Sequence, residues 1–118
     1  MKLHGIAQCD TVRKARTWLA LQGYDIPFHD FRKEGIDRML LERWVKRVHW
    51  QDLVNRKGTT WRQLDESEKA SVQDEISAIE LMLKKPSVIR RPVLESERSI
   101  VVGFDESTYS EFFKNEHA

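Results

Sequence analysis

Leu3-His4-Gly5-Ile6-Ala7-Gln8-Cys9-Asp10-Thr11-Val12-Arg13-Lys14-Ala15, close to the N-terminus, decides how this chain begins to fold. The apolar run Leu3–Ile6 predicts a buried strand. The residues after it repeat at the helical period and predict a helix; the repeat comprises Val12, Ala15, Leu19 and Gln22. Cys9 therefore lies in the turn that opens this helix.

Cys9 is the only cysteine of the chain. Unpaired backbone N–H groups and the positive end of the helix dipole stabilise anions at a helix start, and Arg13 and Lys14 add cationic charge one turn later. The alternative is a buried, inert cysteine, which is the usual state of a free cysteine. Its polar neighbours argue against full burial and favour a reactive thiolate; they are Gln8, Asp10 and Thr11.

Composition limits the classes of function. A chain of 118 residues that is 40% hydrophobic forms one domain with a core. Its 20 Lys and Arg against 19 Asp and Glu give a net charge of +1, so we expect no nucleic-acid partner and no anionic membrane partner. One cysteine allows no internal disulfide, and no apolar run approaches the ~20 residues that span a bilayer. These features predict a protein of the reducing cytoplasm.

The first third of the chain predicts a βαβ unit. The helix from about Thr11 to Gln22 ends at Gly23, a residue suited to a left-handed cap. An extended segment, Tyr24–Phe31, follows and is interrupted by Pro27.

The middle third predicts only helices and loops. We expect a helix capped by Asp37, a short helix over 50–54, a turn capped by Thr59 or Thr60, and a helix that begins at Ser67 and ends before Pro86. The last of these helices has apolar residues spaced for one buried face: Val72, Ile76, Ile79, Met82 and Leu83.

The last third predicts two strands and a helix. The β-branched run 87–94 predicts a strand that breaks or lies at an edge at Pro92. A hairpin at 95–99 leads to the strand Ile100–Val102, and Ser107 or Asp105 caps a final helix. This order predicts an α/β domain with a mixed sheet and a helical insertion between its two halves.

Four segments of the chain, in order and at matching spacing, resemble the arsenate reductase-like (ArsC/Spx) family, most closely its YffB-type branch. They are GIAQCDTVRKA at 5–15, NRKGTTWR at 55–62, PSVIRRP at 86–92 and VGF at 102–104. The resemblance implies a single thioredoxin-like domain over 1–118 with a mixed four-stranded sheet. Its core would comprise about 1–34 and 86–118, and the helical insertion about 35–85.

The resemblance also implies the site. Cys9 would be the nucleophile, Arg13, Arg56 and Arg91 would bind the substrate anion around it, and the Arg91–Pro92 bond would be cis. Guanidinium groups suit this role because a thiolate that attacks an oxyanion must approach negative charge. Adjacent residues of a strand point to opposite faces, so Arg90 and Arg91 cannot both face the cysteine, and the resemblance selects Arg91.

Three departures from the arsenate-reducing pattern predict a weaker oxyanion site. Gly103 stands where those enzymes carry a third arginine, Gly5 replaces a histidine, and Val12 replaces a serine that can hydrogen-bond the thiolate. His4 is displaced by one position, which sends its side chain to the opposite face of the strand.

The leading hypothesis is a glutathione-dependent thiol reductase, or an arsenate reductase-like protein, with Cys9 as its single nucleophile. Because the chain lacks a second cysteine, glutathione would act as co-substrate and supply the resolving thiol. Its extended backbone would pair with the segment beside the cis-proline, at Arg91, Pro92 and Val93. No histidine has metal-ligand spacing with Cys9, so we expect no metal, and we expect a monomer.

Two alternatives remain open. One is a non-enzymatic, Spx-like regulatory protein that binds RNA polymerase. Such regulators often carry a C-x-x-C switch, and Val12 occupies the second cysteine position here, which excludes redox switching of that kind. The other is a family member that keeps the fold and has lost the reaction.

Overall fold

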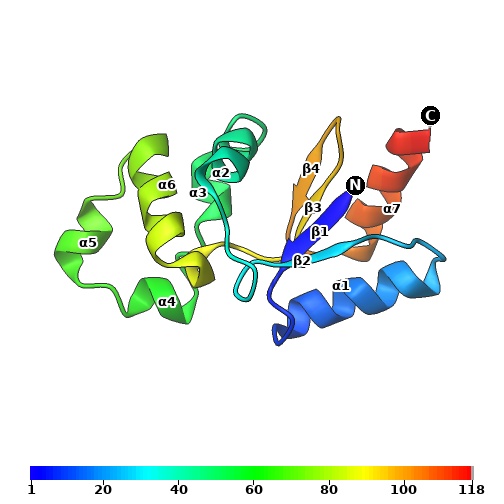
Figure 1. Cartoon of the computed structure of the whole chain (residues 1–118), viewed down its shortest axis with the longest axis horizontal. Coiled ribbons are helices and arrows are strands. Elements are labelled where there is room, and N and C mark those ends of the chain that lie inside the picture. The colour runs from blue at the N-terminus through cyan, green and yellow to red at the C-terminus, as the bar shows by residue number, and fades with distance from the viewer. Residues whose placement is uncertain (118) are drawn as a thin grey trace. The chain divides into compact units, whose positions relative to one another are not determined.

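The structure is a computed structural model that describes residues 1–117, and its chain divides into two compact units (Figure 1). One unit combines residues 1–34 with the chain from Arg91 onward, and we call it the sheet unit. The other spans Gly35–Arg90 and is called the helical unit.

The sheet unit contains a four-stranded sheet in the order β2-β1-β3-β4 (Figure 1). Its elements are β1 (Lys2–Gly5), α1 (Asp10–Leu21), β2 (Phe28–Asp30), β3 (Val93–Glu95), β4 (Ile100–Val102) and α7 (Glu106–His117). β1 pairs with β2 in parallel, whereas the β1–β3 and β3–β4 pairs are antiparallel. The predicted mixed sheet is therefore confirmed.

The core of the sheet unit lies between one face of the sheet and the helices α1 and α7. Leu3 of β1 and Leu94 of β3 are directly paired and supply the sheet side of the core. The helices supply Ala15, Leu19, Tyr109, Phe112 and Phe113. Because side chains alternate along a strand, His4 points to the opposite face from Leu3.

The helical unit consists of short helices: α2 (Arg38–Val45), α3 (Trp50–Leu53), α4 (Thr59–Arg62), α5 (Glu66–Ala70), α6 (Glu75–Lys84) and the 3₁₀ turn η1 (Pro86–Val88). The predicted cap at Asp37 is confirmed, because its carboxylate accepts a hydrogen bond from the Leu40 N–H at 2.8 Å. The cap of α4 is Gly58, and the prediction of Thr59 or Thr60 was wrong.

The single helix predicted from Ser67 was wrong. Two helices occupy this region, and each starts with its own aspartate cap, Asp65 for α5 and Asp74 for α6. Ile76 lies in the first turn of α6 and is 72% exposed, so it does not belong to the buried face. α5 ends at Ala70, and Asp74 starts a separate helix because its side chain accepts a hydrogen bond from the Ser77 N–H of α6.

The strand predicted over 87–94 was also wrong in its first half. Pro86 starts η1, where its missing N–H costs nothing. Ile89 then forms an isolated bridge to Val54, and the Arg90 N–H donates to the Leu53 carbonyl at 2.7 Å. β3 starts only at Val93, after the proline that cannot donate a ladder hydrogen bond.

No helix within residues 1–117 combines the length and the apolar character that crossing a membrane requires.

Candidate functional site

The thiol turn, which we define as Ile6–Cys9, joins β1 to α1. The Cys9 N–H donates to the Ile6 carbonyl at 3.1 Å and closes the turn, while the Cys9 carbonyl accepts the Arg13 N–H at 2.9 Å and begins the helix. Cys9 is thus the N-cap of α1, with an extended backbone at φ −77° and ψ 128°. Within the described chain its partly exposed side chain does not form the capping hydrogen bond of a polar N-cap residue, but the first N–H groups of α1 lie close enough to the thiol to favour its ionised form.

The surroundings of Cys9 favour the thiolate. Partial burial by itself raises the pKa of the thiol, but the Val12 N–H, the guanidinium of Arg91 and the Thr11 N–H together outweigh this effect. The pKa of Cys9 is therefore lowered from its ordinary value. Arg91 acts both as a hydrogen-bond donor and as a positive charge. A lowered pKa and partial exposure are the properties of a nucleophilic cysteine.

The three predicted arginines differ in their surroundings. Arg91 belongs to the sheet unit and interacts with the Cys9 thiol. Arg13 pairs instead with Asp10 at 2.9 Å, and both side chains are exposed. Arg56 belongs to the helical unit, where its guanidinium lies 5.8 Å from the ring centre of Trp50 and 6.0 Å from that of Trp61.

The neighbouring Arg90 belongs to the helical unit and has its own partner there. Its Nε donates to the Asp52 carbonyl at 3.1 Å. The Arg91–Pro92 peptide bond is cis, as the resemblance implied.

The segment predicted to bind glutathione is partly enclosed in the sheet. Val93 is fully buried and lies between His4 of β1 and Val102 of β4. The Pro92 carbonyl accepts the Gly103 N–H at 2.8 Å. Of the three predicted residues, Arg91 is the one that lies outside the strand and remains partly exposed.

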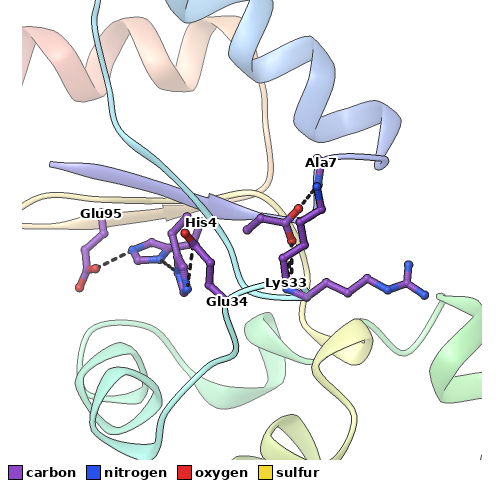
Figure 2. Close-up of polar contacts among 8 residues, drawn as sticks. His4, Ala7, Lys33, Glu34 and Glu95 are labelled. Carbon is purple, nitrogen blue, oxygen red and sulfur yellow. Dashed lines mark hydrogen bonds and ion pairs between the residues drawn. The ribbon is translucent and has the colours of Figure 1, made fainter.

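The face of the sheet opposite α1 carries a polar chain that includes His4, Glu34 and Glu95 (Figure 2). His4 Nε2 lies 2.9 Å from Glu95 Oε1, and its Nδ1 lies 2.8 Å from His29 Nδ1. Burial lowers the pKa of His4 to about 4, although Glu95 opposes the shift. Both ring nitrogens are thus engaged and the ring is neutral at pH 7, so His4 is not a base for Cys9.

Asp30 holds the thiol turn from the end of β2, and the sequence analysis missed it. Its carboxylate accepts the Ala7 N–H at 3.3 Å, the Arg32 N–H at 3.0 Å and the Lys33 N–H at 3.3 Å; Figure 2 shows Ala7 and Lys33 in this cluster. Burial by itself raises the pKa of Asp30, but these three N–H donors lower it overall. An acidic residue at the end of a predicted strand was the available signal.

Residues 1–117 contain no group of three or more His, Cys, Asp or Glu side chains placed to hold a metal ion.

Comparison with known proteins identifies the family. The ArsC family model matches residues 4–112. The chain belongs to the ArsC family. A solved structure named YFFB protein is 50% identical and superposes with a TM-score of 0.88, covering 92% of this chain and 95% of that one. An arsenate reductase (ArsC) related protein from Brucella melitensis is 46% identical with a TM-score of 0.75, covering 97% and 96% of the two chains.

The transcriptional regulator Spx of Streptococcus pyogenes serotype M3 is a more distant relative. It is 26% identical over 112 residues, which cover 92% of this chain and 81% of the regulator. The structural neighbours also confirm the thioredoxin-like fold predicted for this ArsC-family chain.

Two of the departures from the arsenate-reducing pattern are physically coupled in this ArsC-family protein. A Cβ atom added to Gly5 would lie only 2.8 Å from Val12 Cγ2 and 3.3 Å from Val12 Cγ1. Val12 is fully buried in the first turn of α1. The valine therefore fills the space into which a side chain at position 5 would extend, and the two residues suit each other.

The third departure has a backbone cause. Gly103 follows β4 with φ +89°, a left-handed conformation that side chains disfavour. Its carbonyl accepts the Tyr109 hydroxyl at 3.0 Å. An arginine at this position would have to change the local backbone before it could face the thiol.

Proposed function

We propose that this protein is a glutathione-dependent thiol reductase that uses Cys9 as its single nucleophile. The observation that carries the proposal is the Cys9 thiol at the start of α1, whose pKa is lowered by the Val12 N–H and the Arg91 guanidinium against the effect of burial. Family membership supports an oxidoreductase of this general type.

The reaction divides into two thiol–disulfide exchanges. In the first, the Cys9 thiolate attacks the glutathione sulfur of a substrate–glutathione mixed disulfide, and the substrate sulfur leaves as a thiolate. In the second, a glutathione thiolate attacks the glutathione sulfur of a Cys9–glutathione mixed disulfide. This step releases the Cys9 thiolate and oxidised glutathione. Over the cycle, one mixed disulfide and one glutathione thiol become one substrate thiol and oxidised glutathione, and Cys9 is regenerated. The resolving thiol comes from glutathione because the chain has one cysteine.

A disulfide is the preferred substrate over arsenate. Arsenate binding requires several cations around the thiol, and within the sheet unit Arg13 is already paired with Asp10. Val12 and Gly103 supply no further polar side chain. We therefore expect arsenate to be reduced more slowly than a glutathione mixed disulfide. Arg56 remains a predicted ligand for the substrate anion.

Glutathione would bind at the edge formed by Arg91. Its carboxylates suit the guanidinium, and its extended backbone suits pairing beside Pro92, with Val93 supporting that segment from within the sheet.

The test is turnover of a small disulfide such as bis(2-hydroxyethyl) disulfide with glutathione. Cys9→Ser is expected to abolish protein-dependent turnover, because a hydroxyl cannot form the mixed disulfide. Thr17→Ser, an exposed change on the same helix, is the matched control and is expected to retain it. Full turnover in Cys9→Ser would contradict the proposal.

A second candidate is an Spx-like regulatory role, which the 26% identity to a named transcriptional regulator favours. Purified RNA polymerase distinguishes the two. Stoichiometric binding that survives Cys9→Ser would support the regulatory role, and no binding to the polymerase would remove it.

A further inference from the structure

We propose that Asp30 is a positioning residue for Cys9: its buried carboxylate holds the Ala7 N–H and thereby keeps the thiol turn in the geometry that activates the thiol. This role rests on the function proposed for Cys9, because Asp30 would maintain the backbone geometry on which the reactivity of the thiol depends.

The two oxygens of Asp30 have different partners. Oδ1 accepts the Arg32 N–H at 3.0 Å and the Lys33 N–H at 3.3 Å, both from the loop that follows β2. Oδ2 accepts the Ala7 N–H at 3.3 Å. Asp30 is only 7% exposed, so these N–H groups replace the water that an ionised carboxylate loses on burial. One side chain thus ties the loop after β2 to the thiol turn.

A second contact fixes the start of the same turn. The Phe31 N–H donates to the Gly5 carbonyl at 3.0 Å, directly before Ile6. The turn is therefore anchored at Gly5 and at Ala7, and the Ile6–Cys9 hydrogen bond transmits this anchoring to the N-cap position. The effect of the Val12 N–H and of Arg91 on the Cys9 thiol depends on that position, because the attraction between a thiolate and a positive group weakens as the distance between them grows.

A substitution at Asp30 has two effects on the reactivity of Cys9, and they act in opposite directions. A nearby negative charge disfavours a thiolate, so loss of the carboxylate charge alone would make Cys9 more reactive. Loss of the anchor would instead let the thiol move away from its activating donors and make it less reactive.

Asp30→Asn separates these two effects. An asparagine retains one oxygen, which the two donors at Oδ1 will take, and it turns its NH₂ group toward the Ala7 N–H, where two donors repel each other. We expect alkylation of Cys9 by iodoacetamide at pH 7 to slow about three-fold or more, because the thiolate is the reactive species. Asp105→Ala removes the side chain that caps α7 and is the matched control, with an unchanged alkylation rate expected.

An unchanged or faster alkylation rate in folded Asp30→Asn would overturn the proposal. If this variant does not fold, NMR of the unchanged protein provides the test. The chemical shift of the Ala7 amide should follow the acid titration of the Asp30 carboxyl with the same midpoint. An Ala7 amide shift that does not respond to this titration would overturn the proposal. Neither readout uses glutathione. A failure here therefore leaves turnover of the small disulfide intact, whereas failure of the proposed function leaves the Asp30 effect on alkylation intact.

Discussion

The starts of helices α1 and α6 solve the same problem in opposite ways. Asp74 caps α6 fully: its carboxylate accepts the Ser77 N–H at 2.9 Å, and the Ser77 hydroxyl accepts the Asp74 N–H at 3.1 Å. Cys9 occupies the equivalent position of α1, and in the described chain its side chain makes no capping hydrogen bond. One helix start uses its N–H groups for stability, and the other leaves them to act on a thiol.

This difference shows how a helix start becomes a chemical site. Four N–H groups at each helix start lack helical partners, and a capping side chain satisfies some of them. Where a weakly bonding thiol takes the cap position, the N–H groups favour its ionised form instead. The sheet unit therefore gives up some helix stability at the position where we propose catalysis.

Lowering the pH is expected to give the largest difference between the two regions, because it destabilises the sheet unit before it affects the start of α6. His4 lies in the sheet unit, and its pKa is lowered from 6.5 to about 4 in the folded protein, so the unfolded chain binds the proton more readily between these values. Burial of the neutral His4 ring therefore contributes on the order of 3 kcal/mol to the free energy of unfolding above pH 6.5. This contribution is lost as the pH falls toward 4. The Asp74 cap of α6 stays ionised throughout, because its pKa is lowered from 3.8.

Hydrogen exchange read by NMR between pH 7 and pH 4 measures this prediction. Opening of the sheet unit should become easier before the first turn of α6 loses its cap. In His4→Gln, which cannot titrate, the pH dependence should flatten, and an equally steep profile in that variant would show that another group is responsible.

A second effect concerns the packing beneath the start of α1. Gly5→Ala places a Cβ 2.8 Å from Val12 Cγ2, so we expect a loss of about 1–3 kcal/mol in the free energy of unfolding. Val12→Ala in the same chain removes the clash. In a double-mutant cycle measured by urea denaturation, Gly5→Ala should therefore cost much less stability in the Val12→Ala background than in the unchanged protein. Additive losses would mean that Val12 does not limit position 5.

Removing the caps directly compares the two helix starts. Asp74→Ala deprives α6 of its capping box and is expected to lower the thermal midpoint by several degrees. Cys9→Ala removes no capping hydrogen bond, so its midpoint should fall less. Equal losses in the two variants, measured by circular dichroism, would contradict the contrast between the two starts.

The smallest expected effect is a gain. Serine is a preferred N-cap, so below the folded pKa of Cys9, where the thiol is protonated, Cys9→Ser should raise the free energy of unfolding by about 0.5 kcal/mol while it removes the nucleophile. Urea denaturation measures the change. A loss of stability in Cys9→Ser would show that the thiol already caps α1 effectively.

The sequence allowed the local structure around Cys9 to be predicted, because the strand and helix patterns on either side of it are both clear. The sequence predicts a strand over Leu3–Ile6, which the structure places at Lys2–Gly5. The helix of Val12 and Ala15 follows from periodicity, and its left-handed end at Gly23, with φ +82°, follows from glycine. Cys9 could be placed at a helix start because both flanking patterns are strong.

Other features depend on tertiary contacts and could not be predicted. The apolar repeat concealed the break at Asp74, because a capping aspartate and an exposed polar residue look alike in sequence. Asp30 was missed because its partner Ala7 is 23 residues away in the chain and contributes only a backbone N–H. The run 87–94 resembles a strand by composition, yet backbone contacts to Leu53 and Val54 decide its shape.

The most direct test of this account is the pKa of Cys9, measured by pH-dependent alkylation of the folded protein and of the unfolded chain in urea. We expect a lower pKa in the folded state, so ionisation of Cys9 stabilises the fold as the pH rises from that value toward the ordinary value of 9.0. Arg91→Gln should return the pKa part of the way toward the unfolded value. A folded pKa equal to or above that of the unfolded chain would contradict the claim that the start of α1 activates this thiol.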